Sequence, residues 1–436
     1  MRKLAEKIFL AGVDSVLPDK LIRAQMILSD DVLTICGESY DLRNINHIYV
    51  IGAGKAAALM ALETERVLGN RIRAGHVVTK YDHGCALQYI GLTEAAHPVP
   101  DENGVKATEK ITAIARRAKE NDLVICLISG GASALLADTP EGISLEDLRI
   151  TNELLVKSGA TIREINIIRK HLSDIKGGQL ARLIHPANCV SLILSDVVGD
   201  PVDIIASGPT APDASEYSDA YAIVRKYKLD KTLPETVTKH LLLGSAGVIP
   251  ETPDAFHPCF QTTRNRLLGS NKIALEACAQ VAVQNGFDTH IITDSLQEDY
   301  TRVAGFILEN IENFLLIRTT AQPLCLLFGG EPTVKVNGNG LGGRNQHLAL
   351  YLATKLADKP GSTILCAGTD GSDGPTDAAG AVVDNTTFEI SKSKGIDTFQ
   401  YLEQSDSYHF FQQVGGHIRT GSTQTNVMDI IIILIN

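Results

Sequence analysis

Ile48-Tyr49-Val50-Ile51-Gly52-Ala53-Gly54-Lys55 joins a short apolar strand to a glycine turn, and the alanine-rich segment 56–68 that follows is expected to be a helix. Similar short β-rich runs recur through the first half of the chain, at residues 74–80, 122–128 and 189–194. Continuous apolar strands that alternate with helices predict a parallel sheet covered on both faces. The expected fold class is therefore α/β, with a large Rossmann-like parallel-sheet domain followed by a smaller α/β domain.

The length of the chain requires more than one hydrophobic core. Its 436 residues exceed the roughly 250–300 residues at which single cores stop growing. The pattern loosens between residues 209 and 262, where several prolines interrupt short polar stretches. We therefore expect a first domain over residues 1–240 and a second domain over residues 241–436.

The composition is typical of a compact soluble protein that acts on small molecules. Hydrophobic residues make up 44% of the chain. Its net charge of −11 does not indicate the basic surface that nucleic-acid binding requires. The most apolar run, residues 430–435, is long enough for a buried strand but too short to span a membrane. The eight cysteines lack a metal-binding spacing, so we expect reduced, structural thiols in a cytoplasmic protein.

The first glycine loop predicts an anion site. Gly52 and Gly54 allow the backbone to approach a ligand, and the helix that follows supplies free amides and the positive end of its dipole. Lys55 adds a mobile positive charge for a phosphate or carboxylate group. The alternative is an ordinary strand-to-helix turn, because such glycine turns are common.

Two later loops repeat this construction at the ends of other strands. Ser129-Gly130-Gly131-Ala132-Ser133 follows the run 122–128, and ligands bind where such loops meet at the carboxyl ends of parallel strands. After the run 189–194, Asp196 is preferred over Asp200 as a carboxylate that binds magnesium or holds loop amides. The candidate binding residues of these loops are Ser129, Gly130, Gly131, Ser133, Ser207 and Gly208.

A basic patch lies between these loops in the sequence. Arg169, Lys170, His171 and Lys176 occur in a helical context just before two glycines. Because most charge runs are solvated faces, the patch is a secondary candidate for binding a substrate carboxylate or phosphate, with Lys176 among the binding residues. His171 is expected to orient a loop rather than to act as a base.

The second half of the chain carries one cation among many glycines and acids. Gly-Gly-Arg-Asn-Gln at residues 342–346 places Arg344 at the start of an expected helix, where its guanidinium can form two bonds to phosphate oxygens. A glycine-rich surface loop with a salt-bridged arginine is the alternative. The candidate residues here are Glu331, Gly343, Arg344 and Asn345, with Asp370 and Asp373 as metal ligands.

Short segments taken in order carry a family resemblance over nearly the whole chain. They are residues 50–56, 97–101, 127–133, 169–173, 176–178, 195–200, 206–210, 329–331, 342–346 and 368–374. In these segments the chain resembles the glycerate 2-kinase family, whose C-terminal region is called the MOFRL domain and some members of which carry the name hydroxypyruvate reductase. The MOFRL region would cover about residues 320–436.

The resemblance implies an ATP-dependent kinase that phosphorylates D-glycerate at its 2-hydroxyl, giving 2-phosphoglycerate, with Mg²⁺ and in a cleft between the domains. It places the suspected catalytic pair on Lys55 and Arg344. Asp196 is the third catalytic candidate, since Asp196, Asp370 or Asp373 would hold magnesium or orient the attacking hydroxyl. The expected partners are glycerate and ATP, and the expected oligomeric state is a monomer or homodimer.

Two other functions compete with the kinase. An NAD(P)H-dependent hydroxypyruvate reductase would need a complete Gly-x-Gly-x-x-Gly loop and an acidic residue at the next strand end, and neither is evident. A non-catalytic protein that binds sugar acids would use the same loops but would not need the acid-rich cluster. Magnesium-dependent ATP turnover would exclude the binding protein.

Overall fold

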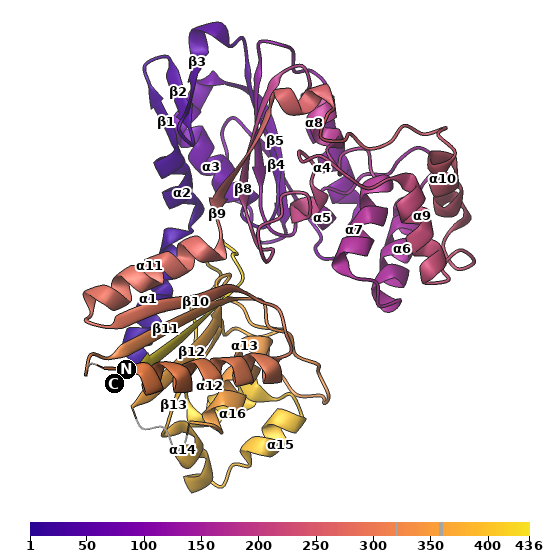
Figure 1. Ribbon diagram of the computed structural model, residues 1–436. Coiled ribbons are helices and arrows are strands. Elements are labelled where there is room, and N and C mark those ends of the chain that lie inside the picture. Colours follow the sequence, from indigo (N-terminus) through magenta and orange to yellow (C-terminus); the bar gives the residue numbers. More distant parts are fainter. Residues whose placement is uncertain (320, 357–360) are drawn as a thin grey trace. The chain divides into compact units, whose positions relative to one another are not determined.

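The computed structural model describes residues 1–319, 321–356 and 361–436, and it divides into two compact units (Figure 1). The first unit comprises Leu21–Ser195 and Asp200–Leu268, and the second comprises Met1–Lys20, Asp196–Gly199 and Gly269–Asn436. This division differs from the expected boundary between residues 240 and 241. The segment after residue 240 still supplies an edge strand to the six-stranded sheet of the first unit. The N-terminal helix packs on the sheet of the second unit.

The first unit is built on a six-stranded sheet in the order β6-β5-β4-β7-β8-β9. Its first five strands pair in parallel and β9 lies at the edge beside β8. Counted along the chain this is the 3-2-1-4-5-6 order of a Rossmann fold, so the predicted Rossmann-like domain is confirmed. The strands are β4 (Ile48–Ala53), β5 (Ile72–Lys80), β6 (Gly91–Ala95), β7 (Leu123–Ile128), β8 (Asn188–Leu194) and β9 (Thr263–Gly269).

Helices and a small second sheet complete the first unit. A three-stranded antiparallel sheet is formed by β1 (Met26–Ser29), β2 (Val32–Ile35) and β3 (Glu38–Asp41). The helices that accompany these sheets are α2 (Pro18–Gln25), whose first three residues belong to the second unit, α3 (Ala57–Leu68), α4 (Glu102–Ala115), α5 (Ala132–Leu135) and α8 (Gln179–Ile184). A helical layer with its own buried core contains α6 (Leu145–Lys157), α7 (Ile162–His171), α9 (Tyr217–Lys226) and α10 (Glu235–Ser245).

The second unit has a mixed sheet in the order β10-β11-β15-β12-β13-β14. Only β10 and β11 pair in parallel among its described strands, and β15 pairs antiparallel with both β11 and β12. This register sets Asp429, the first residue of β15, opposite Gly330 on one side and Gly368 on the other. The strands are β10 (Asp288–Leu296), β11 (Leu324–Gly330), β12 (Ser362–Gly368), β13 (Gly380–Asp384), β14 (His417–Ile418) and β15 (Asp429–Ile435).

Helices cover both faces of this mixed sheet (Figure 1). α1 (Arg2–Ser15) and α11 (Asn271–Gln284) pack together on one face, and α12 (Tyr300–Ile317) and α13 (Arg344–Ala353) pack on the other. The remaining helices are α14 (Thr387–Ser393), α15 (Thr398–Glu403) and α16 (Ser407–Val414). α1 joins this unit because its buried stripe, which includes Ile8, Phe9 and Val13, lies against the second core rather than the first.

Replacing Arg2 with glutamine is expected to lower the free energy of unfolding by about 1–3 kcal/mol, since Arg2 fastens α1 to the end of β13. It donates two hydrogen bonds to the Asp384 carboxylate, at 2.6 and 2.9 Å. Burial alone would raise the pKa of Asp384, but hydrogen bonds from Arg2 and Thr386 outweigh it and hold the pKa below its usual 3.8. The contribution is therefore present above pH 3.8 and is lost as the pH falls further.

Denaturant unfolding of Arg2→Gln at several pH values checks this expectation. The difference from the native chain should be equal at pH 7 and pH 5, and it should shrink below pH 3.8. The exposed neighbour Lys3, changed to glutamine, is the matched control and should unfold like the native chain. Equal stability of Arg2→Gln and the control would show that this ion pair does not hold the helix.

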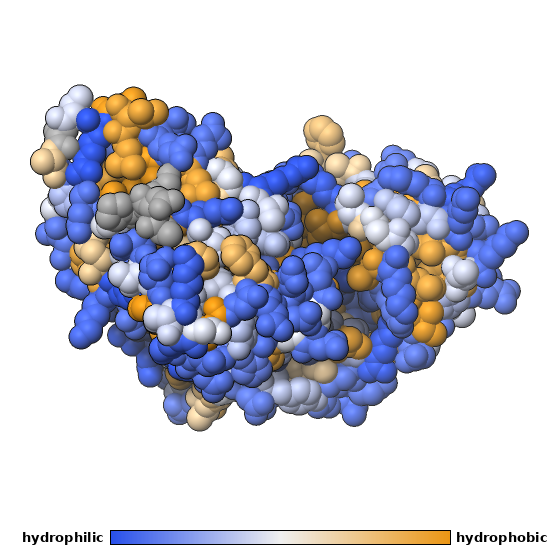
Figure 2. Space-filling view, turned by 90° about the horizontal axis from the view of Figure 1, so that it is seen from below, coloured by the Kyte–Doolittle hydropathy of each residue, from blue (hydrophilic) through white to orange (hydrophobic). Residues whose placement is uncertain are grey.

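The surface seen in Figure 2 is mostly hydrophilic, with separate hydrophobic patches. Among the described residues, no helix combines the length and the hydrophobicity that crossing a membrane requires. All eight cysteines are free thiols. Cys126, Cys325 and Cys366 are fully buried in strands, which confirms that they act as small hydrophobic core residues.

Candidate active site

The glycine loop after β4 is fastened to the loop after β7. Gly54 has a φ of +132°, and a Cβ at this position would lie 2.1 Å from the Ser129 hydroxyl oxygen, so only glycine fits. The Lys55 amide donates to the Gly130 carbonyl at 2.9 Å, and the Ala56 amide donates to the Ser129 hydroxyl at 3.0 Å. Both loops flank the position where the strand order reverses, which is where ligands bind in sheets of this type.

Lys55 and His97 both lie close to Gly131 in the second loop. Gly131 has a φ of +83°, and a Cβ there would lie 3.0 Å from the His97 ring and 3.4 Å from Lys55 Cγ. Burial, with the nearby charges of Lys55 and Lys80, lowers the pKa of His97 to about 4. At neutral pH His97 is therefore an uncharged imidazole, and Lys55 carries the positive charge at this loop.

The loop that contains Ser207 meets the second loop directly. The Ser133 and Ser207 hydroxyl oxygens are 2.6 Å apart, and Ser207 donates to the Asn166 side-chain oxygen at 3.1 Å. Ala206 and Ser207 have φ values of +55° and +60°, a strained conformation for residues other than glycine. The Gly178 amide donates to the Gly208 carbonyl at 2.7 Å. The residues predicted for these loops therefore lie together at the carboxyl ends of the strands.

The basic patch separates into residues with different surroundings. The Lys176 ammonium is buried and donates to the Leu136 carbonyl at 2.6 Å and to Asp138 at 3.1 Å. Lys170 pairs with Asp213 at 3.2 Å. His171 is buried and packs edge-on against Tyr217. Arg169 and Lys176, but not Lys170 or His171, line a pocket.

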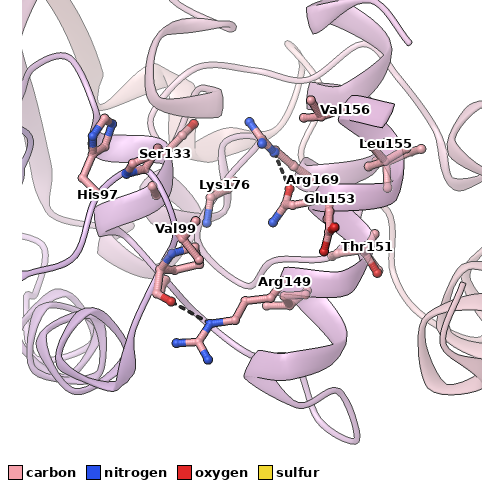
Figure 3. Close-up of a pocket in the computed structure, with 18 of the residues that line it drawn as sticks. His97, Val99, Ser133, Arg149, Thr151, Glu153, Leu155, Val156, Arg169 and Lys176 are labelled. Atoms are coloured by element: carbon pink, nitrogen blue, oxygen red, sulfur yellow. Dashed lines mark hydrogen bonds between the residues drawn. The ribbon is translucent and has the colours of Figure 1, made fainter. Parts of the chain in front are cut away.

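That pocket belongs entirely to the first unit and has a volume of about 700 Å³. Its walls are the segment 97–100, the segment around α5, and the facing sides of α6 and α7. In Figure 3, His97 and Ser133 lie on one side and the α6 residues on the other, with Arg169 and Lys176 between them. Gly131 and Ser133 of the second loop also line it, and Gly131 lies close to Lys55.

In the second unit, Arg344 is held by two carboxylates. Its Nε and Nη2 donate to the two oxygens of Asp429 at 2.6 and 3.0 Å, and its Nη1 donates to Glu331 at 2.6 Å. Asp429 has a side chain only 1% exposed, whereas Arg344 is 33% exposed. Burial alone would lower the pKa of Arg344, but Asp429 and Glu331 outweigh it and raise the pKa. Arg344 begins α13 as predicted. Its guanidinium was expected to form two bonds to phosphate oxygens, and it forms two bonds to the Asp429 carboxylate.

Asp373 fixes the start of α13. Its carboxylate oxygens accept the backbone amides of Asn345 at 3.0 Å and Gln346 at 2.8 Å, and also the Gln346 side-chain amide at 3.0 Å. Burial raises its pKa to about 6 despite these bonds. The Asp373 carboxylate oxygens are therefore already used as hydrogen-bond acceptors at the start of the helix that carries Arg344. This arrangement disfavours Asp373 as a metal ligand.

Asp370 fits a cation better than Asp373 does. It is half-buried at the end of β12, and one carboxylate oxygen accepts bonds from the Ser372 amide and hydroxyl at 3.1 and 3.2 Å. Within the described ranges, no three His, Cys, Asp or Glu side chains converge on one point. Mg²⁺ in phosphoryl-transfer enzymes needs only one or two protein carboxylates, because substrate phosphates complete its shell.

Asp196, the third catalytic candidate, is half-buried and belongs to the second unit. Its carboxylate accepts a hydrogen bond of 3.4 Å from Asn426, in the loop that leads into β15. Sequence reasoning missed Asp429. The sequence shows only an aspartate that opens an otherwise apolar strand, and its position opposite Gly330 and Gly368 comes from the strand register.

Family models match both halves of the chain. One is described as a domain of unknown function, DUF4147, and matches residues 4–242, and the MOFRL family model matches residues 324–429. The solved structure of glycerate kinase from Thermotoga maritima superimposes with a TM-score of 0.88 at 39% identity, covering 100% of this chain and 99% of that one.

Named relatives span the whole chain. It is 40% identical to glycerate 2-kinase of Pyrococcus horikoshii and 39% identical to D-glycerate 2-kinase of Thermotoga maritima, in each case over 100% of this chain and at least 97% of the relative. A putative hydroxypyruvate reductase of Agrobacterium vitis is 42% identical over 88% of this chain and 86% of its own length. The chain therefore belongs to the glycerate 2-kinase family, which combines a DUF4147 domain with a MOFRL domain.

Proposed function

We propose that this protein transfers the γ-phosphoryl group of ATP to the 2-hydroxyl of D-glycerate, giving 2-phosphoglycerate. The observation that carries the proposal is the full-length identity of about 40% to proteins named for this activity. The matched region spans the whole chain and therefore includes the segments that hold Lys55 and Arg344. The proposal is also supported by the two cations, Lys55 and Arg344. Phosphoryl transfer depends on positioning and on neutralising charge rather than on covalent catalysis.

In this proposal Lys55 and Arg344 neutralise the charge that spreads over the transferred phosphoryl group. Lys55 lies on a loop whose backbone is fixed by the Gly130 carbonyl, so the start of its side chain is positioned before substrate binds. Arg344 uses three of its five N–H groups on Asp429 and Glu331, which leaves N–H groups on both terminal nitrogens for phosphate oxygens.

Magnesium is part of the proposal as a companion of ATP. When bound, it would neutralise charge on the phosphate oxygens. Asp370 is the carboxylate that we propose to hold it, and Asp196 would orient the 2-hydroxyl for attack. Asp373 acts through α13 by fixing the helix start that carries Arg344. We further propose that the protein works in the cytoplasm, as a monomer or a homodimer.

The reductase alternative rests on the name of two relatives from Agrobacterium vitis. A dinucleotide-binding domain places an acidic residue at the end of the second strand to bind the ribose. In this chain the corresponding strand, β5, ends in Lys80. A positive charge at this position disfavours NAD but is compatible with NADP. We place the kinase first because of the full-length similarity to proteins named glycerate 2-kinase.

Two assays on the purified chain separate these functions. With ATP, Mg²⁺ and D-glycerate, we expect ADP release that depends on glycerate and stops when the metal is chelated. With NADH or NADPH and hydroxypyruvate, we expect no loss of absorbance at the nicotinamide band. Oxidation of the reduced cofactor without glycerate-dependent ADP release would replace the kinase with the reductase.

A further inference from the structure

We propose that the 700 Å³ pocket of the first unit binds the adenine nucleotide, with the purine against aliphatic side chains of α6 and a phosphate group on Arg169. This inference rests on the proposed kinase function and assigns one of its two substrates to a particular place. It concerns residues of the first unit alone.

Arg169 is the feature that indicates an anion. Its Nε donates to the Asn152 side-chain oxygen at 2.7 Å, and no carboxylate in the described part of the chain forms an ion pair with it. Burial lowers its pKa below the usual value. A cation that is largely removed from water without a counter-ion is unfavourable until an anionic ligand supplies one.

The other charges of the pocket leave Arg169 as the available cation. The lining contains four cations, Arg149, Lys157, Arg169 and Lys176, and three carboxylates, Asp138, Glu146 and Glu153. Asp138 pairs with Lys176, Glu146 with Arg149, and Glu153 with Lys157. Each carboxylate therefore has a partner other than Arg169. The planar guanidinium can bind two phosphate oxygens at once.

The size and the apolar wall of the pocket favour a nucleotide over glycerate. A volume of about 700 Å³ is in the range of pockets for ligands much larger than glycerate. On the side formed by α6 and α7, the pocket is lined by the exposed Val156 and the half-buried Leu148, and by Leu155, Ile168 and Leu172, which are already buried. A small hydroxy acid has little apolar surface to cover Val156 and Leu148, whereas a purine ring has two apolar faces.

Two valines at the pocket suggest where the purine lies. Val99 is 58% exposed and Val156 is 64% exposed, and they line the pocket from opposite walls (Figure 3). A flat ring between these walls would remove apolar surface of both valines from water. The phosphates would then extend toward Ser133 and Gly131, and so toward Lys55.

Calorimetric binding of ADP, pyrophosphate and D-glycerate to the full-length chain tests the inference. Arg169→Gln should weaken ADP and pyrophosphate binding by about tenfold or more, because it removes a charge-assisted contact. Val156→Trp fills the apolar side of the pocket, so it should weaken ADP binding by a similar factor and leave pyrophosphate binding unchanged. Neither change should alter glycerate binding.

The same helices provide matched controls. Arg163 and Ile162 are exposed on α7 and do not line the pocket, so Arg163→Gln and Ile162→Trp should bind ADP like the native chain. Thermal unfolding of every variant checks folding, and Val156→Trp, at an exposed site, keeps the test decisive if Arg169→Gln does not fold.

Three results would overturn the inference: no ADP binding to the native chain, unchanged ADP binding in Val156→Trp and Arg169→Gln, or a loss confined to glycerate, which would assign Arg169 to the hydroxy acid. ADP binding that responds as expected, in a chain that does not phosphorylate glycerate, would instead support the pocket and reject the proposed function.

Discussion

Replacing Lys55 with methionine is expected to lower kcat for glycerate phosphorylation by about 10²–10³-fold, because it removes a positioned positive charge from the transferred phosphoryl group. Methionine keeps much of the length of the side chain and can still pack beside Gly131. The free energy of unfolding should therefore change little. Steady-state ADP release and denaturant unfolding measure the two quantities on the same preparation.

The control for this variant is Lys106→Met, in the same unit. Lys106 is exposed on α4 and does not line the pocket, so its replacement should leave kcat unchanged. Turnover of Lys55→Met within a few fold of the native value would show that Lys55 does not act on the phosphoryl group.

Replacing Arg344 with glutamine should have two effects that can be separated. Loss of the guanidinium should lower kcat by about 10²–10³-fold. It also leaves Asp429, buried and charged, without its partner, which is expected to cost about 3–5 kcal/mol of stability. A loss of turnover in this variant alone would therefore not prove a catalytic role.

The double variant Arg344→Gln with Asp429→Asn separates the two effects. It removes the buried charge together with its partner, so most of the lost stability should return. Turnover should remain low, because the phosphoryl group still lacks the cation. Recovery of turnover together with stability would mean that Arg344 only holds the structure, which is the salt-bridged alternative that the sequence left open.

The parts of the fold that depend on local pattern were predictable. The apolar runs 122–128, 189–194 and 430–435 correspond to β7, β8 and β15, because continuous burial selects apolar residues along the whole strand. The glycine turn after residue 51 is a strand-to-helix loop as expected. Each of these sequence signals lies within about ten residues. It can therefore be recognised without knowing which other elements the strand or turn contacts.

Features that depend on distant partners were not predictable. The apolar stripe of α1 predicts burial, but it does not specify which of two sheets the helix covers. Asp429 reads as the first residue of a strand, and its role appears only when the antiparallel register brings it to Arg344, 85 residues away in the sequence. The role of Asp373 likewise depends on a distant partner. It accepts a hydrogen bond from the Asn345 amide at the start of α13, and the sequence pattern does not show that contact.

The position of phosphorylation is the most direct test of the proposed function. The native chain, incubated with ATP, Mg²⁺ and D-glycerate, should give a single product whose phosphorus resonance is that of 2-phosphoglycerate and whose formation matches ADP release. A product with the phosphate on the 3-hydroxyl, or ADP release without any phosphoglycerate, would contradict it.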